Sequence, residues 1–216
     1  MPRKRFYKRS DAPPKDYQKD FKISDVSKLI DGGYVFGWDP PSGTNFGWAV
    51  LQYKGGEGVY VDSGLAKVPD GDDKRMKFIY DFIQQLGAKY SPVIASLMER
   101  SIGFGWAPAR EKLGENTGII KYASSMIGAE VKPVHTTSMG DTFCKSGGMK
   151  REDKKTAIQN KAKEYFPVSL AAKKITKAGA FTHEADALAF AVGFFIANNI
   201  PIKIEKQEGV KWNDKE

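Results

Sequence analysis

The sequence predicts an α/β fold: a five-stranded mixed sheet, with three antiparallel strands followed by two parallel ones, flanked by helices. Residues 34–39, 46–54 and 58–66 form three runs rich in Val, Tyr, Phe and Trp, separated only by short glycine-bearing turns. Helical patterns then alternate with two more apolar runs, at 93–98 and 130–135. With 216 residues, of which 41% are hydrophobic, the chain is long enough to bury one sizeable core.

The turns and the composition of each run indicate how the strands pair. The turns at 42–45 and 55–56 are too short for a crossover connection, so the first three strands are expected to form an antiparallel meander. Residues 93–98 are almost continuously apolar, which is typical of a strand buried on both faces of a sheet. The run at 130–135 is expected to be a short fifth strand.

Helices are expected between and after these strands. The first should begin at Asp72 or Asp73 and end at Gly87, because apolar residues recur at helical spacing between them. Residues 136–148, rich in Gly, Ser and Thr, are expected to form a loop. Further helices are predicted at 108–127, 151–165 and 183–199.

The charges indicate the class of partner and divide the chain. A basic arm (1–22) is expected to precede one domain (23–206) and a polar tail (207–216). The arm either binds phosphates or serves only as a solubilising tail. The chain has 34 basic and 26 acidic residues, a net charge of +8, which favours polyanionic partners.

Composition also bears on the compartment. Cys144 is the only cysteine, so no internal disulfide can form and nothing indicates an oxidising compartment. No apolar run approaches the roughly 18 residues that span a bilayer. We therefore expect no membrane contact and a cytoplasmic location, in a bacterium or a virus-infected host cell.

Three carboxylates lie at the ends of apolar elements. Asp39 ends the first strand, Glu99 ends the run at 93–98, and Asp186 is expected in the first turn of the last helix. His183 lies three residues before Asp186 and can project from the same face. Phosphodiester cleavage by two divalent cations about 4 Å apart needs hard oxygen ligands of this kind.

Each carboxylate also has a simpler interpretation. Asp39 precedes Pro40 and can be a turn residue, Glu99 can pair with Arg100 at the surface, and Asp186 can be a charge at a helix start. The coincidence of all three in this order of elements favours a metal site that acts on a phosphodiester.

Basic and aromatic residues near these carboxylates are candidates for DNA binding. The stretch from Lys145 to Lys177 contains ten Lys or Arg and only three Asp or Glu, and the alternative is a solvated helix face. Phe104 and Trp106 lie between glycines, where an exposed ring can stack on an unpaired base; the alternative is packing on the core or across a dimer contact. The basic residues expected to bind phosphates are Lys150, Arg151, Lys154 and Lys155.

Four segments together resemble the RuvC-type Holliday junction resolvases of the RNase H-like superfamily, in particular their phage-type members. Residues 37–50 contain Gly-Trp-Asp-Pro and Gly-Trp-Ala-Val, and residues 97–100 are an apolar strand end followed by Glu-Arg. Residues 112–118 match the pattern Lys-Leu-Gly-x-x-x-Gly. The fourth segment joins Asp-Lys-Lys at 153–155 to His-Glu-Ala-Asp-Ala-Leu-Ala at 183–189.

This resemblance implies an RNase H-like fold and two Mg²⁺ or Mn²⁺ ions per active site. It also implies a homodimer that makes paired symmetric nicks in four-way DNA junctions and leaves 5′-phosphates. The resemblance makes the helix at 108–127 a candidate dimer surface. The periodicity of its apolar residues alone predicts only that they pack in the core. The matching catalytic positions are Asp39, Glu99, His183 and Asp186, which would hold the metal, and Lys154 near the scissile phosphate.

Two alternatives stay open at this point. One is an RNase H-like nuclease that acts on other branched DNA or on RNA–DNA hybrids. The other is a non-catalytic DNA-binding protein with the same fold, which intact carboxylates at all three positions argue against.

Overall fold

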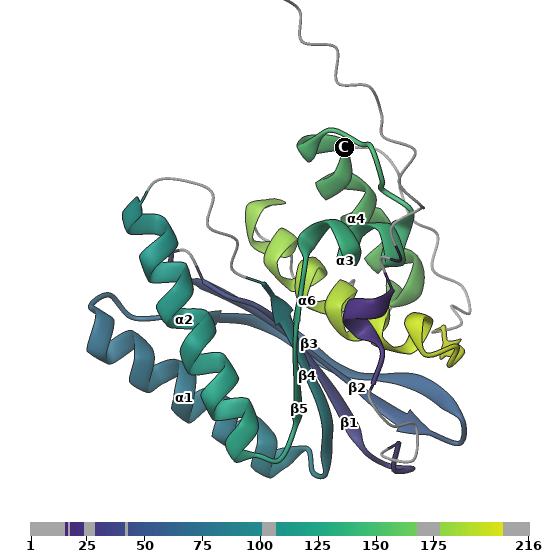
Figure 1. The fold of residues 1–216 in the computed structure, drawn as a ribbon, viewed down its shortest axis with the longest axis horizontal. Helices are drawn as coiled ribbons and strands as arrows, with labels where there is room; N and C mark the ends of the chain where they lie inside the picture. The colour runs from purple at the N-terminus through teal and green to yellow at the C-terminus, as the bar shows by residue number, and fades with distance from the viewer. Residues whose placement is uncertain are drawn as a thin grey trace, which may run out of the picture.

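The computed structural model describes residues 16, 18–23, 29–41, 43–100, 107–167 and 178–204, with the backbone alone for 107–110 and 178–181. Its centre is a mixed sheet of six strands in the order β5-β4-β1-β2-β3-β6. Helices cover both faces of this sheet (Figure 1). The strands are β1 (Tyr34–Asp39), β2 (Asn45–Lys54), β3 (Glu57–Lys67), β4 (Val93–Glu99), β5 (Glu130–Val134) and β6 (Ile202–Lys203).

The pairing of the first five strands confirms the prediction. β1, β2 and β3 form the antiparallel meander, and β4 pairs in parallel with β1 and β5. The sixth strand, β6, pairs in parallel with β3 and was not predicted. It contains only two residues, too few for any alternation of apolar and polar residues to be visible in the sequence.

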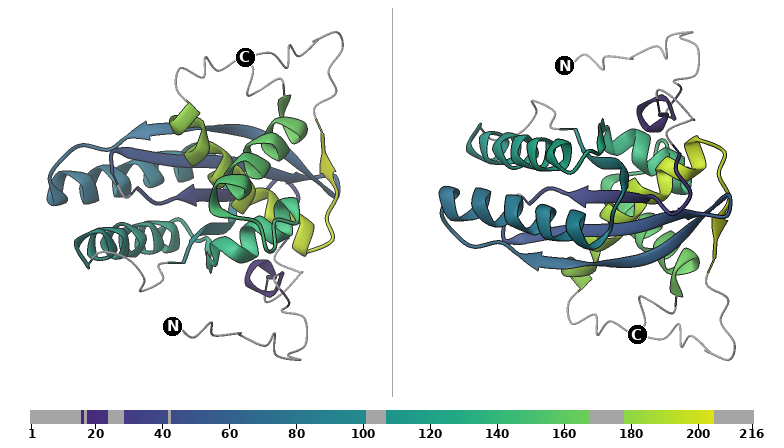
Figure 2. Two further views of the ribbon diagram at one scale, coloured as in Figure 1. Left: turned by 90° about the horizontal axis from the view of Figure 1, so that it is seen from above. Right: turned by 90° about the horizontal axis from the view of Figure 1, so that it is seen from below.

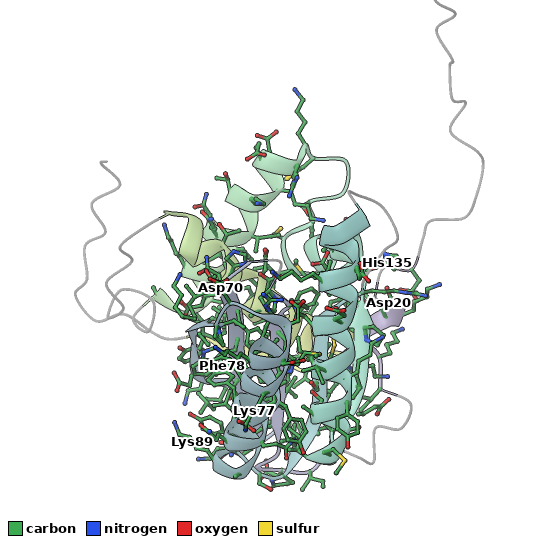
Figure 3. The ribbon with its side chains drawn as sticks, turned by 90° about the vertical axis from the view of Figure 1, so that its left-hand side faces the viewer. Asp20, Asp70, Lys77, Phe78, Lys89 and His135 are labelled. Carbon is green, nitrogen blue, oxygen red and sulfur yellow. The ribbon has the colours of Figure 1, made fainter. Side chains whose placement is uncertain are left out.

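The helices form one layer on each side of the sheet. α1 (Asp72–Lys89) and α2 (Ala107–Met126) lie side by side on one face (Figures 2 and 3). They bury an apolar cluster that includes Phe36 and Trp38 of β1. α6 (Ala178–Ala197) lies on the other face, and α3 (Thr136–Cys144) and α4 (Arg151–Tyr165) pack against α6. Among the described residues, no helix combines the length and the apolar character needed to cross a membrane.

α1 does not end at Gly87, as the sequence predicted. It continues to Lys89 and stops before Pro92, which disfavours helix in the residue that precedes it. Gly87 is buried, and a Cβ added there would lie 2.6 Å from Ile127 Cγ2. The glycine therefore allows α1 to pack closely against the end of α2 and is not a helix stop.

Residues 136–144 were expected to lie in a loop, but they form α3. Met139 and Phe143 lie one turn apart on this helix, and both are buried in the core against α6 and α4. The burial of these two side chains outweighs the weak helix propensity of the surrounding Gly, Ser and Thr residues.

α6 begins at Ala178, five residues earlier than predicted. Asp186 therefore lies more than two turns into the helix, where the charge at the helix start no longer acts on it. Ala185, Ala187 and Ala189 of this helix are fully buried. Small side chains at these positions allow the backbone of α6 to lie close to the strands.

Only the end of the predicted basic arm is described. Lys19–Phe21 form a 3-10 turn, and Phe21 is fully buried in the core. Asn198, the residue after α6, holds the end of this turn, because its Nδ2 donates to the Phe21 carbonyl and its Oδ1 accepts from the Ile23 N–H. Residues 1–15 of the predicted arm and the predicted tail at 207–216 lie outside the described residues.

Candidate active site

The three predicted carboxylates meet at one end of the sheet. Asp39 is the last residue of β1, and Glu99 is the last residue of β4, its parallel neighbour. Because parallel strands end at the same edge of a sheet, the two side chains lie at the same edge. Together with Asp186 and His183 of α6, they line a cavity of about 700 Å³. The structure thus places all four predicted residues around one cavity.

Two glycines bring α6 onto the sheet at this place. A Cβ added at Gly37 of β1 would overlap the backbone oxygen of Ala187, and one added at Gly47 of β2 would overlap that of His183. Both would lie closer than the 3.0 Å that real Cβ atoms keep. Gly47 is also the cross-strand partner of Asp39. The helix therefore packs directly on the backbone of β1 and β2 beside the catalytic candidate Asp39.

Asp39 and His183 are in direct contact. Nδ1 of His183 faces Oδ2 of Asp39 in a short hydrogen bond or ion pair. This contact raises the pKa of His183 above its usual value, while burial acts in the opposite direction. The pKa of Asp39 is also raised, because burial outweighs the lowering effect of the His183 contact.

The other two carboxylates are held in an unfavourable electrostatic environment. Burial raises the pKa of Glu99 to about 7, and the negative charge of Asp39 adds to the shift. Asp186 has its pKa raised to about 7 by burial first and then by the charge of Asp39. Three carboxylates that oppose one another's ionisation need nearby positive charge in order to ionise together. The positive charges of Lys154 and Arg151 lower the pKa of Glu99 in part, and the structure records no ion pair between Glu99 and Arg100.

The donor set fits a divalent cation by its chemistry. Carboxylate oxygens and an imidazole nitrogen are ligands that Mg²⁺ or Mn²⁺ accepts, and a bound cation would relieve the repulsion among the carboxylates. In the described part of the chain, however, no three His, Cys, Asp or Glu side chains already surround one ion position. Oδ2 of Asp39 instead faces His183, so cation binding through this oxygen requires the pair to separate.

Three of the four predicted phosphate-binding residues also line this cavity, all from α4. They are Arg151, Lys154 and Lys155. Lys154 Nζ donates to the backbone carbonyl of Thr136, 2.5 Å away, and burial lowers the pKa of this amine. The fourth, Lys150, is exposed and does not line the cavity. Phe104 and Trp106, predicted to stack on bases, lie outside the described residues.

Several residues that the sequence did not single out hold this site together. Gln159 of α4 donates to Thr182 of α6 over 2.7 Å, which joins the helix that carries Lys154 to the helix that carries Asp186. Asn116 of α2 is buried and donates to the Pro41 carbonyl over 2.6 Å, which fixes the chain just after Asp39. Nothing in the pattern of the sequence distinguishes these amides from surface residues.

Glu184, the residue after His183, has a partner outside the cavity. It is buried and accepts a hydrogen bond of 2.5 Å from Ser63 Oγ of β3. Its side chain does not line the cavity. Glu184 is therefore placed apart from His183 and Asp186, which do line it.

Comparisons with known proteins support the fold assignment. No protein-family model and no curated protein sequence matches the chain. Among solved structures, Thermus thermophilus RuvC in complex with a Holliday junction substrate is similar, with a TM-score of 0.58 and 19% sequence identity. That similarity covers 77% of this chain and 96% of the RuvC chain.

A second similar structure comes from a different organism. The yeast mitochondrial Holliday junction resolvase Ydc2 has a TM-score of 0.57 and 13% identity, over 85% of this chain and 84% of that protein. The chain therefore has the fold of RuvC-type resolvases, which confirms the RNase H-like fold that the sequence predicts.

Proposed function

We propose that this protein is a divalent-metal-dependent endonuclease that resolves four-way DNA junctions. The observation that carries the proposal is the convergence of Asp39, Glu99 and Asp186 with Lys154 in one cavity of a RuvC-like fold. The similar Thermus protein was solved with a Holliday junction substrate, and the similar yeast protein is named a Holliday junction resolvase. The net charge of +8 adds a general attraction for the DNA backbone.

Each residue of the cavity has a part in the proposed reaction. Asp39, Glu99 and Asp186 would hold two Mg²⁺ or Mn²⁺ ions, which would supply a nucleophilic water and stabilise charge on the leaving oxygen. Nδ1 of His183, released from Asp39, accepts a proton from that water. The water oxygen forms a bond to phosphorus, and the bond from phosphorus to the 3′-oxygen breaks. The 3′-oxygen gains a proton, and the new end keeps a 5′-phosphate.

The basic residues of α4 act on the phosphates. Lys154 is half-buried at the cavity, where its ammonium group can stabilise negative charge that develops on the scissile phosphate. Arg151 and Lys155 also line the cavity and hold phosphates beside the cut, as does the exposed Lys150. Binding is therefore expected to weaken steeply with salt.

Paired nicks require two active sites, and α2 offers a surface for a homodimer. Ile120 and Ala123 of this helix are buried core residues, but Tyr122 and Met126 are 56% and 57% exposed. A shallow groove beside Tyr122 is lined by residues of α2 and β5, Val131 and Pro133 among them. Exposed apolar side chains next to such a groove are typical of an interaction surface.

The test is a nicking assay on a synthetic immobile four-way junction with all strands labelled. We expect symmetric paired nicks with Mg²⁺ or Mn²⁺, and little cleavage of a replication fork or an RNA–DNA hybrid. Asp39→Asn should reduce cleavage by at least about 100-fold and leave junction binding intact. The control is Asp81→Asn, an exposed carboxylate on α1 that pairs with Lys77.

The outcomes separate the candidate functions. Preferential cleavage of the fork or of the hybrid would assign the protein to the wider class of RNase H-like nucleases. Junction binding without cleavage under any metal and pH would support the non-catalytic alternative. Full activity of Asp39→Asn would overturn the metal assignment.

A further inference from the structure

The side chain of Lys154 lies against a glycine of the helix that the sequence did not predict. A Cβ added at Gly140 of α3 would overlap Lys154 Cε and Ser146 Oγ and would lie 3.0 Å from Lys154 Nζ. The Lys154 side chain therefore occupies the space that any other residue at position 140 would fill. An exposed lysine avoids such a contact easily, but Lys154 is half-buried.

The end of the same side chain is held by α3 as well. Lys154 Nζ donates to the carbonyl oxygen of Thr136, which lies one helical turn before Gly140. A carbonyl oxygen has two lone pairs, so it can accept this bond in addition to a helical one. α3 thus provides a slot for the stem of Lys154 and an acceptor for its ammonium group.

The slot is rigid because α3 is fixed on several sides. Met139 and Phe143 are buried in the core, and Ser138 Oγ donates to Asp20 Oδ2 over 3.0 Å. After the helix, the Ser146 N–H donates to the Gly140 carbonyl over 3.3 Å. A methyl group at Gly140 would therefore displace the lysine side chain more easily than it would move the helix.

We propose that Gly140 is a positioning residue for the nuclease reaction, because its missing side chain gives Lys154 the path across α3 into the cavity. This inference rests on the proposed function for its kinetic consequence. Its structural part, that position 140 controls the placement of the Lys154 amine, does not depend on catalysis.

The structural part is tested by acylating the lysines of the full-length protein with a small amine-reactive reagent at fixed pH. We expect Lys154 to be labelled slowly in the natural protein and several times faster in Gly140→Ala. Lys77, whose side chain is 75% exposed, is the internal reference. Gly114→Ala is the matched control, because a Cβ at this helical glycine of α2 meets nothing within 4 Å. Unchanged labelling of Lys154 in folded Gly140→Ala would overturn the proposal.

The kinetic part is tested by a double-mutant cycle with Lys154→Ala. Removal of one charged group that stabilises a transition state costs on the order of 100-fold in turnover. Gly140→Ala should approach that loss while junction affinity changes less than about threefold. In the Lys154→Ala background, it should cause no further loss. If the double variant loses the product of the two single losses in turnover, the proposal is contradicted.

Two further provisions keep the outcomes distinct. If Gly140→Ala does not fold, Ser146→Gly is added, which removes Ser146 Oγ from the path of the methyl group. The acylation experiment and the double-mutant cycle are then repeated with Ser146→Gly present in every protein compared. The results that support or overturn the proposal stay the same. If the natural protein cleaves no junction, the proposed function fails, and the labelling experiment alone still decides whether Gly140 positions Lys154.

Discussion

Nδ1 of His183 contacts Oδ2 of Asp39, although 144 residues separate the two in the chain. The contact forms where α6 passes directly over Gly47, the cross-strand partner of Asp39. A helix cannot come this close to a strand that carries a side chain at the crossing point. The geometry of the candidate active site therefore depends on Gly47, a residue that has no side chain and takes no part in the chemistry.

Gly47→Ala is expected to disturb both stability and cleavage. The added methyl group would overlap the His183 backbone oxygen, so α6 must move away from β2. Overpacking of this kind costs about 1–3 kcal/mol or more, and the displacement separates His183 from Asp39. We expect a lower melting temperature and a cleavage rate at least about tenfold lower.

The matched control is Gly43→Ala, because a Cβ there meets nothing within 4 Å. This variant should melt and cleave like the natural protein. Normal activity in Gly47→Ala would show that the close approach of α6 to the sheet is not needed.

The repulsion among the carboxylates makes stability depend on pH when no divalent cation is present. The pKa of Glu99 is raised from 4.5 to about 7 in the folded protein, so the folded state binds its proton more tightly than the unfolded state. That contribution to stability is complete below about pH 4.5 and is lost as the pH rises through about 7. At pH 8, ionised Glu99 therefore opposes folding.

Glu99→Gln is accordingly expected to raise the melting temperature at pH 8 in EDTA by a few degrees. This corresponds to about 1–2 kcal/mol after a discount for the partial exposure of the side chain. Below pH 4.5 the variant and the natural protein should differ little. Glu164→Gln, an exposed carboxylate paired with Lys161, is the control and should show no such gain. A variant less stable than the natural protein at pH 8 would contradict the electrostatic account.

Divalent cations are expected to stabilise the natural protein by binding the same carboxylates. At a concentration 100 times the dissociation constant, a ligand specific for the folded state adds about 2.7 kcal/mol, which corresponds to roughly 5–10 °C for a chain of this length. The melting temperature should therefore rise with Mn²⁺ or Mg²⁺ and should not rise in Asp39→Asn. Equal shifts in both proteins would place the binding elsewhere.

The sequence was sufficient to predict the first five strands of the sheet and the positions of Asp39 and Glu99 at strand ends. Strands pair according to turn length and apolar pattern, so the parallel neighbours β1 and β4 and the meeting of Asp39 with Glu99 followed from local features. The start of α6 at Ala178 was not predicted, because the helical pattern in the sequence was recognised only from His183 onward.

Other parts of the site depend on contacts between distant segments. The polar composition of 136–144 indicated a loop, and only the tertiary burial of Met139 and Phe143 makes it a helix. Their spacing of four residues was the one available signal. The roles of Gly47 and Gly140 are set by what lies opposite each glycine, and this cannot be seen in a single sequence.

The proposed dimer surface on α2 gives a separate prediction. Replacing the exposed Tyr122 and Met126 by lysine introduces like charges at the symmetric contact, which should convert a dimer to a monomer in sedimentation or light scattering. Paired nicking should then become single nicking, while Asp39 and its partners remain intact. Lysine at the exposed position Ile30, far along the chain from α2, is the control. A variant that stays dimeric would exclude this surface.

The most direct test of the account is a crystal structure of the protein soaked with Mn²⁺ and measured at a wavelength where manganese scatters anomalously. We predict two anomalous peaks about 4 Å apart in the cavity, in contact with Asp39, Glu99 and Asp186, with His183 separated from Asp39. A cavity without manganese, in which Asp39 stays paired with His183 at saturating Mn²⁺, would contradict the claim that these residues form a metal-dependent active site.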